Sequence, residues 1–323
     1  MVSENLKKGI FFGILGALFI GFQPIVANAR PSEIDSYIYA AMTVLVEALI
    51  FFPVMLFERN KIKSDFQKGL LNSDEKQSLL FGYKNNILLL IFVGAVFGFG
   101  QILFFLGYKL AGAINGSLAQ KATVFFSLFF SWLILKEKIT KRQIFFSILL
   151  FFGLILAVTK GSFDLLRLNQ GVLILLILTS LWMLAHTLTK PLFNKKEAIA
   201  SQIVFIRNFL GAIILFSTYF LFFPLSNISI LLNPEYVLWG IAMGSVYGIG
   251  LFFWYKTLQY LEVSKASILV SPTPIITAIY AMLFLGEQFT IFHLLGSIII
   301  IFSIIMIVQV KKEEKIAMPI EVS

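Results

Sequence analysis

The chain has 323 residues, of which 59% are hydrophobic and 13% are charged, and its formal net charge at pH 7 is +9. Soluble domains carry about 25% charged residues, so this composition excludes a soluble globular protein and indicates an integral membrane protein. The absence of cysteine excludes disulfides, thiolate metal sites and cysteine nucleophiles.

Ten apolar stretches follow one another along the chain. A helix that crosses a bilayer needs about 20 mainly apolar residues, and each stretch, delimited by the nearest charged residues, has roughly that length. The sequence therefore predicts ten membrane-spanning helices, at residues 9–29, 36–57, 86–109, 112–135, 142–159, 169–189, 199–222, 236–259, 263–286 and 291–310. The first stretch is too long for a signal-peptide core, so we expect it to stay as a helix. Residues 58–84 form the only substantial polar linker, and we expect no extramembrane domain.

The lysines and arginines are concentrated in every second loop. Because cytoplasmic loops carry an excess of basic residues, this pattern predicts a multi-pass protein of the cell membrane with both termini in the cytoplasm. It also explains the positive net charge without a nucleic-acid partner. The predicted cytoplasmic segments hold Lys7, Lys8, Arg59, Lys61, Lys63, Lys68, Lys76, Lys84, Lys136, Lys138, Lys141, Arg142, Lys190, Lys195, Lys196, Lys311, Lys312 and Lys315.

A heptapeptide at residues 94–100, Gly-Ala-Val-Phe-Gly-Phe-Gly, returns at residues 244–250 as Gly-Ser-Val-Tyr-Gly-Ile-Gly. The chain is therefore a duplication, with a first copy at residues 1–160 and a second at residues 161–323. Five helices per copy force the second copy to enter the membrane from the opposite side. We predict an all-α integral membrane protein with ten transmembrane helices in two inverted five-helix repeats. The glycine clusters are expected to let helices cross closely. The same offset relates Ser117 to Ser267, Glu137 to Glu287 and Thr140 to Thr290.

Each copy ends with a span, an acidic residue at the helix end (Glu137 or Glu287) and a final span. This pattern resembles the drug/metabolite transporter superfamily, and more narrowly its EamA branch, over nearly the whole chain. The second copy is the closer match because it contains Ser271-Pro272-Thr273-Pro274, whereas the first copy has Val124 where the family often has a proline, so it gives little reason to expect a helix break there. The resemblance implies export or exchange of small metabolites, often amino acids or related compounds, by alternating access, and names no substrate. We interpret the two glutamates as structural elements of the hairpins, with gating as the lesser alternative.

Three charged residues stand out inside the predicted spans. A charge at the bilayer centre costs about 2.5 to 3.5 kcal/mol on insertion scales, so each is a functional candidate. Lys121 is interpreted as a contact for a substrate carboxylate or phosphate, with an ion pair to Glu47 as the alternative. Glu47 either couples transport to protons or forms a helix–helix ion pair. Arg207 is expected to be structural or interfacial, because an arginine near a helix end can reach the membrane surface.

Helical spacing groups Lys121 with serines of both copies. Ser117 and Lys121 are four residues apart, as are their repeat mates Ser267 and Ser271, so each pair shares one helix face. Two such faces are predicted to flank one central substrate site near the membrane midplane, between the repeats. The alternative for each serine is close helix packing or a bond back to its own helix.

Five more residues are candidates for the same substrate site. Gln23 and His186 occupy equivalent positions in the first and sixth spans, which favours an inward role for both. Gln101 shares a face with phenylalanines of the third span, and Tyr247 and Trp254 share a face of the eighth, where they could present a hydroxyl and an indole donor. Core packing is the alternative for the aromatic residues.

The resulting functional hypothesis is a secondary active transporter of a small polar metabolite that works without ATP, since the chain has no nucleotide-binding motif. A sugar-phosphate or nucleotide-sugar exchanger, with Lys121, Arg207 and Lys256 binding the anion, is the alternative within transport. A membrane-embedded enzyme or lipid-handling scaffold is the alternative from another class. No clustered nucleophile, base or metal set is apparent, so we expect no enzyme, no metal and no cofactor. The expected partners are a small-molecule substrate and the lipid bilayer, and Glu47 leaves proton coupling open.

Overall fold

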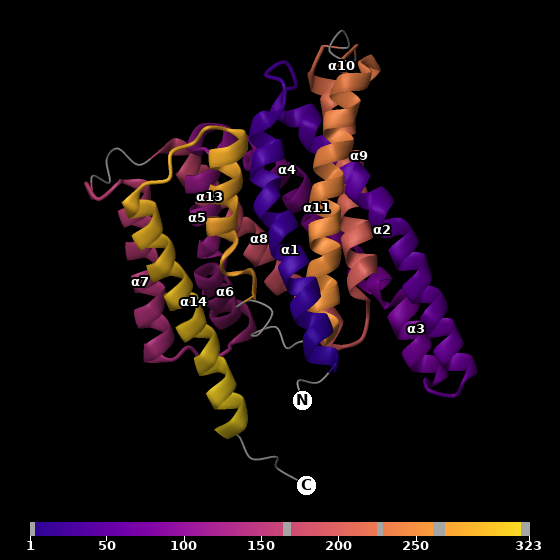
Figure 1. Ribbon diagram of the computed structural model, residues 1–323. Coiled ribbons are helices and arrows are strands. Elements are labelled where there is room, and N and C mark those ends of the chain that lie inside the picture. Colours follow the sequence, from indigo (N-terminus) through magenta and orange to yellow (C-terminus); the bar gives the residue numbers. More distant parts are fainter. Residues whose placement is uncertain (1–3, 164–168, 225–228, 261–268, 318–323) are drawn as a thin grey trace. The chain divides into compact units, whose positions relative to one another are not determined.

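The computed structural model describes residues 4–163, 169–224, 229–260 and 269–317 (Figure 1). Within these ranges the regular secondary structure is entirely helical. Nine of the described helices are long and apolar enough to cross a membrane, and a further apolar helix, α13 (Thr273–Phe284), is shorter. The predicted all-α membrane fold is confirmed, although the first part of the ninth predicted span, at residues 263–268, lies outside the described residues.

The described helices follow the predicted spans closely. In the first copy these are α1 (Glu4–Ala29), α2 (Ser36–Gln67), α3 (Ser73–Phe81), η1 (Gly82–Asn86), α4 (Ile87–Ala111), α5 (Ala113–Ala119), η2 (Gln120–Ala122), α6 (Thr123–Leu135) and α7 (Lys141–Val158). In the second copy they are α8 (Gln170–Asn194), α9 (Ala200–Phe222), α10 (Ser229–Leu232), α11 (Pro234–Tyr260), α13 and α14 (Ile291–Ala317).

The polar linker at residues 58–84 is helical over most of its length. Helix α2 continues beyond the predicted end of its span to Gln67. At 1.5 Å per residue its 32 residues extend about 48 Å, well beyond a hydrocarbon core of about 30 Å. Helix α3 then starts at a capping box, in which Asn72 Oδ1 accepts the Glu75 N–H over 2.7 Å and Glu75 Oε2 accepts the Asn72 N–H over 3.3 Å. The linker is thus a helical extension, which hydropathy alone does not reveal.

The chain divides into two compact units, each built from both copies. Unit 1 comprises Met1–Ala29, Gly107–Thr179 and Ile249–Ser323, and unit 2 comprises Arg30–Leu106 and Ser180–Gly248. Within unit 1, α7 packs along α14 and α1 along α13, and within unit 2, α2 packs along α9 (Figure 1). Because α7 and α14, like α2 and α9, are equivalent helices of the two copies, the duplication is visible in the packing of each unit.

Glycines bring α4 and α9 close together in unit 2. A Cβ atom added at Gly98 would lie 3.1 Å from the Gly211 Cα, and one added at Gly94 would lie 3.2 Å from the Arg207 carbonyl oxygen. Both distances are too short for an ordinary carbon contact, so only glycine lets the two backbones approach this far. The close crossing expected of the glycine cluster at residues 94–100 is confirmed, and it places Phe97 on α4 against the polar part of α9.

The same turn joins the last two helices of each copy. Its first residue adopts a left-handed conformation, with φ of 58° in the first copy and 66° in the second. The N–H of the next residue donates to the carbonyl six positions earlier over 3.2 Å in both copies, and a threonine then caps the following helix. The repeated motif therefore encodes a repeated helix stop and start. The matching positions are Lys136 and Gly286, Glu137 and Glu287, and Thr140 and Thr290.

Candidate functional site

A buried carboxylate and a buried amide face each other in unit 2. Glu47 lies in α2 and Asn208 in α9, and each is 2% exposed. Asn208 Nδ2 donates to Glu47 Oε2 over 2.9 Å. The amide therefore satisfies one carboxylate oxygen of the residue predicted to couple protons or to form an ion pair.

Arg207 precedes Asn208 and carries the positive charge of this region. Its side chain is 4% exposed, and its guanidinium carbon lies 3.8 Å from the centre of the Phe97 ring. Arg207 is close enough to Glu47 to attract it electrostatically, yet its Nε has no hydrogen-bond partner among the described residues. Of the structural or interfacial role expected for Arg207, the interfacial alternative does not fit, because close packing of α4 on α9 encloses the side chain; the structural alternative stays a prediction.

Aromatic side chains from three helices surround Phe97 and continue along unit 2. The Trp182 ring stacks on Phe97 with centroids 6.1 Å apart, and the His186 ring meets the Phe97 ring edge to face at 5.3 Å. Phe104 contacts Trp182 at 6.2 Å and Tyr247 at 5.7 Å. Trp182 is 9% exposed and its indole Nε1 has no partner among the described residues, whereas His186 is exposed. The structure thus brings the predicted residues His186 and Tyr247 into one aromatic cluster.

Gln101 adds a second amide to this cluster. It lies one turn after Phe97 on α4, so the two side chains share a face of the helix. Gln101 is 3% exposed, and its Nε2 is buried without a hydrogen-bond partner in the described structure. Together with Arg207 and Trp182, it supplies buried donors without acceptors. We call Glu47, Phe97, Gln101, Trp182, His186, Arg207, Asn208 and Tyr247 the unit 2 cluster.

Lys121 lies in unit 1, where two helix interruptions meet. It sits in η2, a single 3₁₀ turn between α5 and α6, so the first copy is interrupted although Val124 replaces the proline. Its Nζ donates to the Val270 carbonyl over 2.9 Å. In a continuous helix this carbonyl would accept an N–H from residue 274, and Pro274 has none. Lys121 and Thr273 Oγ1, at 2.5 Å, take the place of the missing donor.

The other predicted residues of unit 1 make local contacts. Ser117 is buried and donates to the Ile114 carbonyl over 2.8 Å, which is the bond back to its own helix considered as the alternative. Ser271 is also buried, at 2% exposed, and Ser267 lies outside the described residues. A Cβ atom added at Gly250 would lie 3.3 Å from Gln23 Nε2, so the Gln23 amide packs on the backbone of α11.

Trp254 lies half-buried on α11 where that helix passes close to α1. A Cβ atom added at Gly16 would lie 3.6 Å from the Trp254 backbone nitrogen. The predicted site residues are therefore divided, with Gln23, Ser117, Lys121, Trp254 and Ser271 in unit 1 and Glu47, Gln101, His186 and Tyr247 in unit 2. Lys121 and Glu47 each have a partner within their own unit, and an ion pair between them stays a prediction.

Glu287 caps a helix of the other copy within unit 1. Its Oε1 accepts the Ala113 N–H over 2.6 Å and its Oε2 accepts the Ile114 N–H over 3.1 Å. The residue before this helix, Gly112, has φ of 79° and no side chain to cap it, so the carboxylate satisfies the free N–H groups. This contact gives Glu287 the structural role expected from the sequence.

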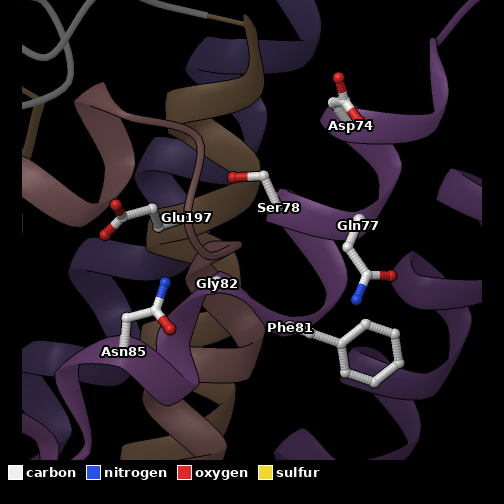
Figure 2. A pocket seen from close by; sticks show the side chains of 7 residues that line it. All are labelled: Asp74, Gln77, Ser78, Phe81, Gly82, Asn85 and Glu197. Atoms are coloured by element: carbon white, nitrogen blue, oxygen red, sulfur yellow. The ribbon is translucent and has the colours of Figure 1, made fainter.

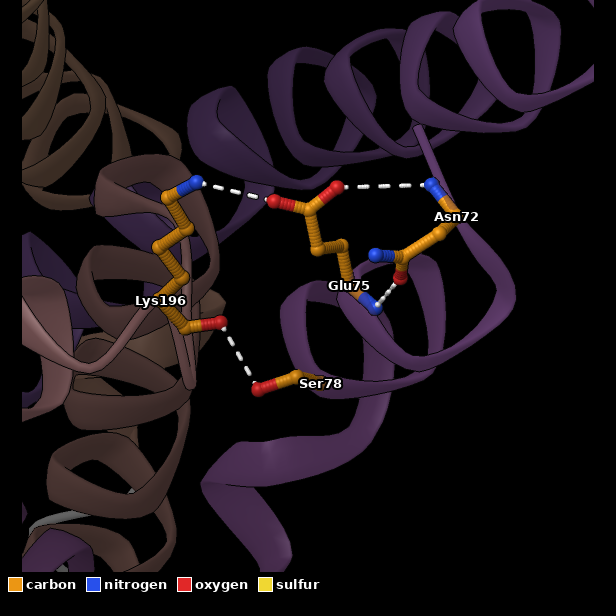
Figure 3. Close-up of polar contacts among 4 residues, drawn as sticks. All are labelled: Asn72, Glu75, Ser78 and Lys196. Carbon is orange, nitrogen blue, oxygen red and sulfur yellow. Dashed lines mark hydrogen bonds and ion pairs between the residues drawn. The ribbon is translucent and has the colours of Figure 1, made fainter. Parts of the chain in front are cut away.

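An open cavity of about 320 Å³ lies at the helical extension in unit 2, away from the cluster described above. Its lining comes from α3, η1 and the turn before α9: Asp74, Gln77, Ser78, Phe81, Gly82, Asn85 and Glu197 (Figure 2). Polar contacts attach α3 to that turn: Ser78 Oγ donates to the Lys196 carbonyl and Lys196 Nζ pairs with Glu75, each over 3.0 Å (Figure 3). None of the predicted site residues lines the cavity.

Sequence reasoning missed Phe97 and Asn208 as members of this site, and it considered Arg207 only as an anion contact of the exchanger alternative. The sequence did contain one signal. Because α2 and α9 are equivalent helices of the two copies, the Glu47 carboxylate inside the span of α2 favours polar partners in α9. The described residues contain no group of three or more histidine, aspartate or glutamate side chains arranged to hold a metal ion.

Comparisons with known proteins bear on the fold and the family. The model of the EamA-like transporter family matches residues 7–159 and 169–309. The chain is 24% identical over 216 residues to a Bacillus subtilis (strain 168) protein named Uncharacterized transporter YyaM, covering 65% of this chain and 68% of that protein. It is 22% identical over 299 residues to an Uncharacterized transporter of Methanothermobacter thermautotrophicus (strain Delta H), covering 90% of this chain and 81% of that protein. A solved crystal structure with 12% identity matches the fold with a TM-score of 0.60, covering 94% of this chain and 98% of that one.

Proposed function

Because the chain belongs to the EamA-like transporter family, we propose that it is a secondary active transporter of small polar metabolites, amino acids or related compounds, working by alternating access. The observation that carries this proposal is the unit 2 cluster, where Arg207, Gln101 and Trp182 hold buried donors without acceptors. Polar groups inside membrane helices are costly and mark solute pathways. Donors left without protein partners are available to a solute.

The helix interruptions in unit 1 support a transport mechanism. Transporters commonly form their sites at discontinuous helices, where backbone groups are released from the helical pattern. Here η2 interrupts the first copy and a turn at residues 271–272 precedes α13 in the second, and Lys121 joins the two interruptions through the Val270 carbonyl. Because the hydrogen bond from Lys121 to Val270 joins two helix interruptions, it is suited to break and reform during alternating access.

The proposed location is the cell membrane, with both ends of the chain in the cytoplasm. The loop charges support this orientation, because they place the helical extension of α2 and α3 on the same side as the ends. Arg59 of this extension donates to the Leu80 carbonyl over 2.8 Å, so one of its basic residues also joins α2 to α3.

The amino-acid proposal is favoured over a phosphate exchanger. A phosphate carries nearly two negative charges and calls for several cations. Lys121, one of the three cations considered for the exchanger alternative, directs its Nζ to the Val270 carbonyl. The unit 2 cluster contributes a single cation, Arg207, among its described residues. This count fits a solute with one negative group.

Counterflow in liposomes tests the proposal. Purified protein is screened for thermal stabilisation by a metabolite library, because a ligand that binds the native state raises its apparent stability. Each stabilising compound is then loaded inside proteoliposomes and its labelled form is supplied outside. We expect at least one small polar metabolite to accumulate faster than in protein-free liposomes. A folded protein that exchanges none of them contradicts the proposal.

A further inference from the structure

Three arginines of unit 2 stack on aromatic rings, and one of them differs from the others. The guanidinium carbon of Arg30 lies 5.2 Å from the centre of the Tyr39 ring, that of Arg59 lies 5.1 Å from Phe81, and that of Arg207 lies 3.8 Å from Phe97. Arg30 and Arg59 also donate to protein oxygens, at Ser36, Ile34 and Leu80. Arg207 is the most buried of the three, and its Nε has no acceptor within the described structure.

Stacking leaves the Nε donor of Arg207 available. The Phe97 ring covers a face of the guanidinium, while the N–H groups of guanidinium lie in its plane and point outward from its edge. A ring face attracts the cation but accepts no ordinary hydrogen bond from those edge groups. Glu47 attracts Arg207, but the buried Nε has no acceptor among the described residues. A buried donor without an acceptor is costly, so an arrangement that retains it suggests a missing partner for that donor.

The neighbouring unsatisfied groups are donors as well. Gln101 Nε2 and Trp182 Nε1 are buried without partners, and both residues are grouped with Arg207 around Phe97. An ionised carboxylate accepts hydrogen bonds through both oxygens and donates none. Guanidinium edges bind carboxylates through two parallel hydrogen bonds. The chemistry of the three donors therefore matches a carboxylate.

The charge of Arg207 and the neighbouring aromatic rings restrict the chemical class of the solute further. Arg207 provides one positive charge, which can balance one carboxylate and would leave a dianionic phosphate uncompensated. Trp182, Phe97 and Phe104 form a continuous run of rings beside the donors. Such a surface is suited to an apolar or flat portion of the solute.

We propose that Arg207 binds the carboxylate of the transported solute, assisted by Gln101 and Trp182, so that the substrate class is monocarboxylates with a compact apolar portion. The proposal rests on the proposed transport function for its physiological meaning. The binding site itself does not depend on that function, because it is defined by groups of unit 2 alone.

Binding of matched probes to the purified protein tests this site. Acetate, pyruvate and phenylacetate are compared with acetamide, pyruvamide and phenylacetamide, and benzylphosphonate serves as the dianionic probe. Thermal unfolding and calorimetric titration report binding. We expect a carboxylate to bind and its neutral amide to bind at least about tenfold more weakly, as the loss of a charge-assisted hydrogen bond predicts. Equal binding of acid and amide across the panel, or preference for benzylphosphonate, overturns the assignment.

Variants connect the affinity to the named donors. Arg207→Met is expected to abolish the preference for the acid over the amide, and Arg207→Lys to keep part of it, because lysine retains the charge without the planar fork. Gln101→Leu removes one donor without changing the charge and is expected to weaken carboxylate binding severalfold. Arg59→Met is the matched control, since Arg59 also stacks on a ring but already donates to a carbonyl. Undiminished preference in both Arg207→Lys and Gln101→Leu overturns the proposal even if Arg207→Met does not fold.

Transport measurements separate this inference from the proposed function. Counterflow of a neutral or cationic metabolite that is unaffected by Arg207→Lys would leave the transport function standing and overturn the carboxylate site. Carboxylate binding that depends on Arg207, without exchange of any compound, would support the site and contradict the transporter proposal.

Discussion

Replacing Lys121 with methionine tests whether this lysine supports the interruption of the ninth span. Methionine keeps the length and apolar stem of the side chain but removes the ammonium that donates to the Val270 carbonyl. Residue 274 is a proline and has no N–H to donate to that carbonyl, so the substitution leaves the carbonyl with the Thr273 hydroxyl as its donor. We expect Lys121→Met to fold and to be less stable than the wild type.

The size of the effect follows from the single contact. A hydrogen bond to a charged donor contributes about 1.5 to 3 kcal/mol, and the half-buried position of Lys121 favours the lower end of this range because solvent screens the charge. A loss of about 1.5 kcal/mol lowers the midpoint of thermal unfolding by a few degrees in a protein of this size. Lys109→Met is the control, since Lys109 is an exposed lysine of the same unit.

A double-mutant cycle identifies the partner. Pro274→Ala gives residue 274 an N–H that can donate to Val270 as in a regular helix. If the backbone carbonyl is what Lys121 satisfies, Lys121→Met should cost clearly less in the Pro274→Ala background than in the wild type. A second cycle combines Lys121→Met with Glu47→Gln. The stability loss caused by Lys121→Met should disappear in the Glu47→Gln background only if Lys121 and Glu47 form an ion pair.

Transport provides the result that would refute this reasoning. A Lys121→Met protein with wild-type stability and a tenfold or greater loss of counterflow would show that the ammonium contacts the solute, as the sequence first suggested. Equal stability losses in the wild-type and Pro274→Ala backgrounds would show that the carbonyl is not the partner that matters.

Three further predictions concern other contacts. Glu47 attracts Arg207 and so competes with a carboxylate solute, which means that Glu47→Gln should strengthen carboxylate binding; calorimetric titration of the wild type and the variant measures this, and an unchanged affinity would contradict it. Gly98→Ala should lower the midpoint of thermal unfolding, because its Cβ would meet the α9 backbone at 3.1 Å. Gly16→Ala is the control, since a Cβ there meets its nearest neighbours at an ordinary 3.6 Å. Equal decreases in the two variants would contradict the close-packing argument. Glu287→Gln should cost about 1 kcal/mol by weakening the cap on α5, and an unchanged unfolding midpoint would show that this cap contributes nothing.

The fold was predictable because the bilayer imposes strong rules on sequence. Spans need long apolar runs, and two copies with five spans each must be inverted, so hydropathy and one repeated heptapeptide were sufficient. The helical extension at residues 58–84 obeys no such rule. Its helices depend on capping, such as Asn72 with Glu75, and on docking to the turn at Lys196, neither of which changes hydropathy.

The site was predictable only in part, because partners decide what a polar residue does. Position in the span identified Glu47, Gln101, His186 and Tyr247 as inward candidates, and they lie in one unit. Depth alone suggested an interfacial position for Arg207, which is near a helix end yet enclosed by a glycine-mediated crossing. Burial at a helix end depends on how closely the next helix approaches, and that distance is a property of the packed structure.

Lys121 and Arg207 show how a rule about proline could have corrected the prediction that Lys121 contacts the substrate. A proline removes the donor for the carbonyl four residues earlier, so Pro274 points to Val270 as a group in need of a partner, and the repeat places Lys121 at the matching break. Lys121 is thereby accounted for within the protein. No proline of α9 creates a carbonyl for Arg207, whose neighbours among the described residues are a ring, further donors and the Glu47 carboxyl group, already bonded to Asn208. The cation with a buried donor that has no acceptor among the described residues is the one to assign to the solute, and that cation is Arg207.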